Sequence, residues 1–171
     1  DMTVAELVAL DDKTEGIITA TLVTGNIASF GSLADDHGNN ALAINVNDAT
    51  SKAEANALAA KTAGVVTASV EETAFSALTG LTTAATDAIT FSMNDNAITA
   101  ANLATLAGKT SVQLTSDSAL NVTDLNGVTT GKGFSNAVAT YVFQDDDDAV
   151  RLDGLHTNDV LSLGADTSGN F

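Results

Sequence analysis

The chain has 171 residues, of which 44% are hydrophobic, and its 22 acidic and 6 basic residues give a formal net charge of −16. This charge repels nucleic-acid phosphates and anionic membrane surfaces, so neither is an expected partner, and it favours divalent cations. The hydrophobic content argues against disorder, the absence of cysteine excludes disulfides and thiolate metal sites, and no apolar run reaches the ~20 residues of a membrane-spanning helix.

A segment that opens with a helix-capping sequence occurs three times at a spacing of 48 residues. The three copies read TVAELVALDDKT (3–14), SKAEANALAAKT (51–62) and TAANLATLAGKT (99–110). The first two copies carry the Ser/Thr-x-x-Glu pattern of a capping box, and the third carries it imperfectly. Apolar residues three apart predict a short helix in each copy. We expect these helices to end at Lys13, Lys61 and Lys109, where a cation suits the negative end of the helix dipole.

Strands with a two-residue period are predicted after each helix. Their inward residues are Ile18, Ala20 and Leu22, then Val66, Ala68 and Val70, then Val112 and Leu114. A second half-unit follows each strand, with apolar residues at 27, 30 and 33, at 75, 78 and 81, and at 122, 125 and 128. Further strands follow at 42–46, 89–93 and 139–143. One half-unit therefore takes roughly 24 residues, the length of one strand, one short helix and two turns.

This periodicity predicts a right-handed α/β solenoid of about six coils, with a parallel sheet on one face and short helices on the other. We expect Leu10, Leu58 and Leu106 to occupy equivalent positions in the stack. The strands alternate in polarity, so one face of the sheet should be open to solvent. A compact α/β sandwich is the alternative. We assign 1–144 to the repeats and 145–171 to an acidic cap and tail, and we expect the array to continue before residue 1.

The acidic cap supplies the candidate metal ligands. Carboxylate oxygens in a loop suit calcium, and the candidates are Asp145, Asp146, Asp147, Asp148, Asp153 and Asp159. The alternative is a solvated acidic turn, followed by strands at 149–155 and 160–163 that cover the last coil.

Other polar groups have a structural explanation. The oxygen-rich turns at 45–48, 94–96, 35–36 and 39–40 contain Asn and Asp, which favour turns for conformational reasons. His37 and His156 lie more than a hundred residues apart in polar segments, where we expect surface loops. The sequence has neither a nucleophile elbow nor a phosphate-binding loop. We therefore expect no enzyme and, calcium apart, no cofactor.

Two stretches resemble known families. The segments ANALAAKTAG (55–64) and ANLATLAGKTS (101–111) resemble repeats of very large bacterial cell-surface proteins, including S-layer-like and adhesin-like ones. The segment DAVRLDGLHTNDVLSL (148–163) is similar to the segment that closes many type I secreted, calcium-associated proteins. The resemblance implies an extracellular, cell-surface module with a structural or adhesive role, whose partners are neighbouring copies, cations or surface glycans. A carbohydrate-active enzyme on a parallel β-solenoid and a virion decoration protein are the alternatives.

Overall fold

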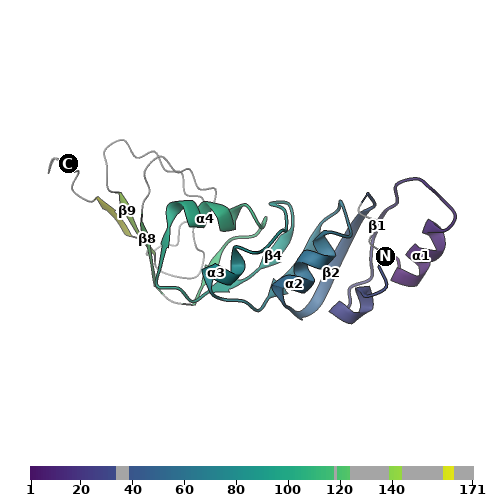
Figure 1. Cartoon of the computed structure of the whole chain (residues 1–171), viewed down its shortest axis with the longest axis horizontal. Helices are drawn as coiled ribbons and strands as arrows, with labels where there is room; N and C mark the ends of the chain where they lie inside the picture. The colour runs from purple at the N-terminus through teal and green to yellow at the C-terminus, as the bar shows by residue number, and fades with distance from the viewer. Residues whose placement is uncertain (34–38, 118, 124–138, 144–159, 164–171) are drawn as a thin grey trace. The chain divides into compact units, whose positions relative to one another are not determined.

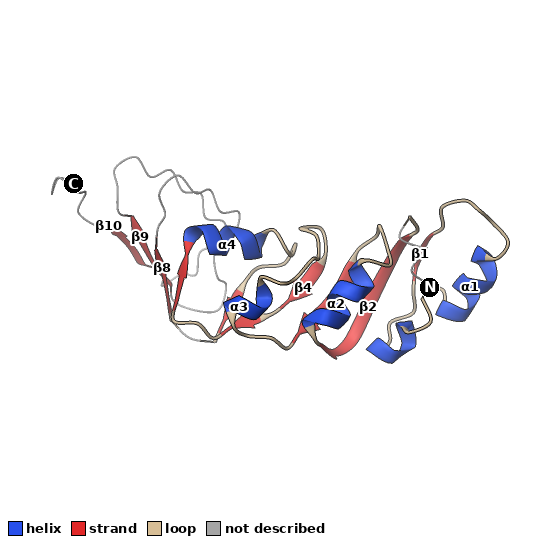
Figure 2. Ribbon diagram, in the orientation of Figure 1, coloured by secondary structure: helices blue, strands red, loops and turns tan. Residues whose placement is uncertain are grey.

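A computed structural model of the chain describes residues 1–33, 39–117, 119–123, 139–143 and 160–163. The protein is mixed α/β, and its sheets are built from parallel strands (Figure 2). It divides into two compact units, which are described separately. The first comprises 1–71, 80–90 and 109–112, and the second comprises 72–79, 91–108 and 113–171. Figure 1 labels several elements of each unit.

The first unit places helices beside a parallel sheet. Its helical segments are α1 (Val4–Asp11), the 3-10 helix η1 (Ile27–Phe30) and α2 (Lys52–Ala59). Its strands are β1 (Thr19–Thr21), β2 (Ala41–Thr50), β3 (Val66–Val70) and β4 (Ala88–Thr90), paired in that order. The core consists of apolar side chains from both layers, among them Leu7, Leu22, Phe30, Leu42, Ile44, Leu58, Val66 and Ile89. Each fully buried Leu or Ile contributes about 1.5–3 kcal/mol of hydrophobic stabilisation.

The second unit is built in the same way. Its helices are α3 (Phe75–Leu78) and α4 (Ala100–Ala107). Its strands are β5 (Ser92–Met93), β6 (Ala97–Thr99), β7 (Thr115–Ser116), β8 (Leu120–Thr123), β9 (Ala139–Phe143) and β10 (Val160–Leu163). Among the described residues, β10, β9, β8 and β6 form one parallel sheet in that order, and β5 pairs with β7. The buried apolar side chains include Met93, Ile98, Leu103, Leu106, Leu120 and Val122.

The 48-residue repeat is present in the helices themselves. Helices α1, α2 and α4 begin at residues 4, 52 and 100 and are each eight residues long. The capping boxes predicted at the first two are confirmed: the Thr3 and Ser51 hydroxyls accept hydrogen bonds from the N–H groups of Glu6 and Glu54, whose carboxylates accept in return. At the third, the Thr99 hydroxyl accepts from the backbone N–H of residue 102 at 3.3 Å. The imperfect third box therefore keeps one half of the arrangement.

Three predictions about element boundaries were wrong. The helices end two residues before each lysine. The Lys13 and Lys61 amides donate to the carbonyl oxygens three residues earlier, which is the 3-10 pattern of a tightened last turn. The predicted strand at Val112 begins later, at β7. Val122 lies in a strand and not in a helix. It belongs to β8, which pairs with both β6 and β9 and whose burial alternates along the strand. Residues 125 and 128 lie outside the described segments.

The three leucines predicted to be equivalent differ in burial. Leu58 and Leu106 are 3% and 0% exposed, whereas Leu10 is 40% exposed. The difference has a local cause, because Leu58 borders a hollow that it shares with Ile27 and Phe30 of η1. The corresponding side of α1 is open to solvent.

Candidate functional site

Buried polar side chains in the first unit bind the backbone at the start of the preceding strand. We call these four side chains the capping ladder: Asn40, Thr62, Asp87 and Thr110, all of them buried. They accept from the N–H groups of Ile18 (2.7 Å), Leu42 (2.7 Å), Val66 (2.8 Å) and Ile89 (3.1 Å), respectively. Each bond joins residues 20 to 22 positions apart. A buried N–H without a partner is strongly unfavourable, so each ladder residue satisfies a donor that the parallel pairing leaves open at a strand start.

Thr62 has the densest set of contacts in the ladder. Its hydroxyl also accepts from the Gly64 N–H at 2.8 Å and lies 3.0 and 2.8 Å from the carbonyl oxygens of Asn40 and Leu42, to one of which it donates. Thr110, 48 residues later, repeats this pattern around Ile89. In the second and third copies, the threonine of the Lys-Thr pair therefore connects neighbouring strands, whereas Thr14 of the first copy accepts from the nearby Gly16 N–H. Sequence reasoning used the pair only as a helix end; the fixed distance from threonine to the next strand was the available signal.

Aspartates from two of the oxygen-rich segments cap short helices. In the first unit, Asp48 Oδ1 accepts from the Ile27 N–H of η1 at 3.0 Å. In the second unit, Asp95 Oδ2 accepts from the Phe75 N–H of α3 at 2.7 Å. A carboxylate at a helix N-terminus is favoured by the helix dipole as well as by the hydrogen bond. The predicted turn at 45–48 was wrong, because these residues lie within β2, at the point where its register against β3 shifts between Asn45 and Ala49. Asp48 and Asp95 have a structural role, but it is to bind helix starts about 20 residues away and not the backbone of their own turns.

The six predicted metal ligands, Asp145 to Asp148, Asp153 and Asp159, lie outside the described residues, as do His37 and His156. Within the described part of the chain, no cluster of three or more His, Cys, Asp or Glu side chains is placed to hold a metal ion. The same part of the chain contains no helix of the length and apolarity needed to cross a bilayer. The calcium prediction stays a prediction.

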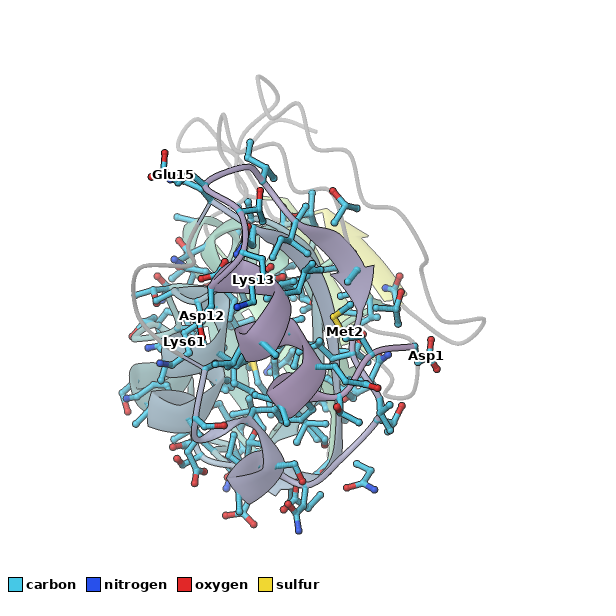
Figure 3. All side chains as sticks on the ribbon, turned by 90° about the vertical axis from the view of Figure 1, so that its right-hand side faces the viewer. Asp1, Met2, Asp12, Lys13, Glu15 and Lys61 are labelled. Atoms are coloured by element: carbon cyan, nitrogen blue, oxygen red, sulfur yellow. The ribbon has the colours of Figure 1, made fainter. Side chains whose placement is uncertain are left out.

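A polar hollow of about 320 Å³ lies beside the end of α1. Its lining includes Asp11, Glu15, Asn39 and Asn40. The Asn40 amide donates to Asp11 Oδ1 at 3.2 Å and accepts from the Ile18 N–H, so this ladder residue also fixes one wall of the hollow. Figure 3 labels Glu15 and the neighbouring Lys13. Two carboxylates give the hollow an acidic lining.

The outward side of the first sheet is uncharged. We define the outer face as the outward residues of β1 to β4: Thr19, Thr21, Ala41, Ala43, Asn45, Thr67, Ser69, Ala88 and Thr90. They are exposed or half-buried, which confirms that one side of this sheet faces solvent. Neighbouring strands in a sheet lie about 4.8 Å apart, so the face is an array of hydroxyl, amide and methyl groups, interrupted where the register of β2 shifts between Asn45 and Ala49. Such a surface suits contact with a hydroxyl-rich partner, because it offers hydrogen bonds without desolvating a charge.

Two carboxylates on exposed helix starts have altered acidity. The backbone N–H of Thr3 and then its hydroxyl, both bonded to the Glu6 carboxylate, lower the pKa of Glu6. The same two bonds from Ser51 lower the pKa of Glu54. The hydrogen bonds at both helix starts therefore favour the ionised form of the capping carboxylate.

No protein-family model matches the chain, and neither a curated protein nor a solved structure matches it.

Proposed function

We propose that this chain is a structural module whose half-units stack as a right-handed α/β solenoid and present the outer face to hydroxyl-rich surfaces outside the cell. The stacked arrangement is supported by helices that recur every 48 residues, each with a Ser or Thr hydroxyl as its N-cap. It is also supported by parallel strand pairs, which require a crossover from each strand to the next. Crossovers of this kind are right-handed in nearly all known sheets.

The capping ladder is the observation that carries the proposal. In the first unit, the buried polar groups Asn40, Thr62, Asp87 and Thr110 bind the backbone of the strand before them. Their hydrogen-bonding groups thus join one half-unit to the next, which suits a structural scaffold. The surface offered to a partner is then the outer face.

Surface glycans fit the outer face better than charged polymers do. The chain carries a net charge of −16, yet the outer face has no ionisable side chain. A polysaccharide contacting Thr67, Ser69 or Thr90 meets hydroxyl groups, and acids elsewhere on the chain keep neighbouring copies apart unless salt or divalent cations screen them. We include calcium in the proposal as the cation that the acidic segment 145–159 would take.

Binding to insoluble neutral polysaccharides such as cellulose and chitin tests the role of the outer face. We expect the wild-type chain to sediment with one of them and Thr67→Lys to lose at least tenfold in affinity. Ala53→Lys places the same charge on the exposed side of α2 and should bind like wild type. Absence of binding by the wild-type chain, or equal binding by both variants, would contradict the proposal. Turnover of a polysaccharide would favour the carbohydrate-active enzyme instead.

Thermal unfolding in calcium and in chelator tests the cation. A higher midpoint in calcium is expected if the acidic segment binds it. Identical curves would remove calcium from the proposal and leave the outer face untouched.

A further inference from the structure

A hollow of about 390 Å³ lies in the helix layer of the first unit, between the start of α1 and η1. We call it the α1–η1 hollow. Helix α1 has eight residues and η1 has four, which correspond to lengths of about 12 Å and about 8 Å, so the shorter helix cannot follow α1 along its whole length. Met2, which precedes the cap of α1, is bonded to Thr21 and Val23 in the sheet and is not part of the lining. The lining residues are Thr3, Val4, Ala5, Val23, Thr24, Gly25, Ser29, Phe30 and Ser32.

The lining combines apolar surface with hydroxyl groups and has no ionisable side chain. Val23 is 47% exposed and offers apolar surface, while Thr24 and Ser32 are exposed, so their hydroxyls can bond a ligand. Ligand pockets in proteins usually have about 300–1,000 Å³ and combine apolar walls with a few polar groups, as this hollow does. In a chain with a net charge of −16, an uncharged lining favours a neutral ligand, because a charged one would be desolvated without a partner.

The start of α1 adds backbone donors to the α1–η1 hollow. The Thr3 hydroxyl accepts from the Glu6 N–H at 3.2 Å, and the Glu6 carboxylate accepts from the Thr3 N–H at 2.8 Å. The N–H groups of Val4 and Ala5 belong to the first turn, so no carbonyl oxygen of α1 can accept from them. A ligand oxygen can accept from these two groups. An anion is disfavoured there, because the Glu6 carboxylate already lies at the same helix start.

The uncharged lining belongs to the first copy of the repeat and not to the repeat as such. The residues 48 positions after Val4, Val23 and Thr24 are Lys52, Glu71 and Glu72. Helix α2 nevertheless begins at the same repeat position as α1 and with the same type of cap. Charged residues at these positions are therefore compatible with the local fold, so folding alone does not explain why the first copy has none.

We propose that the α1–η1 hollow binds one neutral sugar unit of a glycan. A sugar ring carries hydroxyl groups around its edge, which can bond Thr24, Ser32 and the open N–H groups of α1. Its faces carry C–H groups, which can contact the apolar surface of Val23. The inference rests on the proposed function for the source of the sugar, a surface glycan, but none of the lining residues belongs to the outer face.

Titration of the isotope-labelled full chain with soluble sugars, followed by NMR of the backbone amides, tests the site and its ligand class. The neutral probes are glucose, galactose and N-acetylglucosamine. We expect at least one of them to give saturable shifts at Val4, Ala5 and Thr24. Glucuronate, which adds a charge, and cyclohexanol, which keeps a ring with a single hydroxyl, should each bind at least tenfold more weakly. The proposal is overturned if no neutral sugar gives saturable shifts up to its solubility, or if either comparison compound binds as tightly as the best sugar.

Two variants introduce the charges that the second copy carries at these positions. Thr24→Glu and Val23→Glu should each weaken sugar binding at least tenfold, and circular dichroism checks that they fold. Thr86→Glu is the matched control, because Thr86 is exposed in the same unit but outside the lining. Equal sugar affinity in all three variants would refute the site. Thr67→Lys should bind the soluble sugar like wild type, and Thr24→Glu should sediment with insoluble polysaccharide like wild type, so this inference and the proposed function can fail separately.

Discussion

Replacing Thr62 by valine removes one oxygen atom from the capping ladder and keeps the shape of the side chain. The hydroxyl accepts from the N–H groups of Leu42 and Gly64 and donates to a carbonyl oxygen of β2 or its neighbour. Leu42 is 0% exposed, so its N–H has no access to water after the substitution. Gly64 is half-buried, and its N–H can be partly solvated.

The expected magnitude follows from these two donors. A buried donor left without a partner costs about 1–3 kcal/mol. The Leu42 N–H incurs this full cost, and the half-buried Gly64 N–H adds a smaller one. The extra methyl group of valine offsets under about 1 kcal/mol. We therefore expect Thr62→Val to lower the free energy of unfolding by about 2–3 kcal/mol.

Urea denaturation followed by circular dichroism measures this change by linear extrapolation. Thr67→Val is the matched control, because the same substitution on the exposed side of β3 should change the free energy by less than about 0.5 kcal/mol. Hydrogen exchange gives a local readout, since the Leu42 amide should lose protection selectively in Thr62→Val. Equal stabilities of the two variants, together with an unchanged Leu42 exchange rate, would refute the role of the ladder.

Three further predictions concern the repeat. Gly64→Ala would place a Cβ 2.4 Å from a backbone oxygen of β2, so we expect a loss of about 1–3 kcal/mol in urea denaturation. Gly16→Ala, at the same repeat position, meets only a side-chain oxygen at 3.2 Å and should lose much less. The hydrogen bonds from Ser51 lower the pKa of Glu54 in the folded state, so its stabilising contribution is full above its ordinary pKa of 4.5 and is lost as pH falls through the lower folded value. Glu54→Gln should therefore show a shallower loss of stability below about pH 4.5 in acid titration, and an unchanged slope would contradict this. Leu58→Ala should lose about 2–5 kcal/mol by the same assay, and a loss below 1 kcal/mol would show that the site beside η1 is not tightly packed.

The helices of the repeat could be predicted from the sequence because their signals are local. A Thr or Ser followed three residues later by Glu satisfies a helix start within a single turn, and the caps at Thr3 and Ser51 form as predicted. The two-residue period of β3 is also local, and its burial alternates along the strand as predicted. Parallel pairing was expected from strands separated by short helices, and all the described pairs are parallel.

The capping ladder was missed, because its partners are 20 to 22 residues apart and belong to different half-units, and only its threonines carry a repeat signal. Nothing in the composition near Asn40 or Asp87 distinguishes a buried backbone acceptor from a solvated turn residue. The later half-units also depart from the repeat, and Val122 illustrates why. Its neighbours Leu120 and Asn121 fit a strand as well as Leu125 fits a helix, and pairing with β6 decides the outcome.

The direction of the ladder has a consequence for synthesis of the protein. Each acceptor comes later in the chain than the strand amide it satisfies. A nascent strand such as β2 therefore leaves the ribosome with the Leu42 amide open, and that amide gains its partner only when Thr62 emerges. Folding should then proceed from the amino end and lag synthesis by about one half-unit of chain. A translational pause before that half-unit has emerged would leave the newest strand start exposed to water.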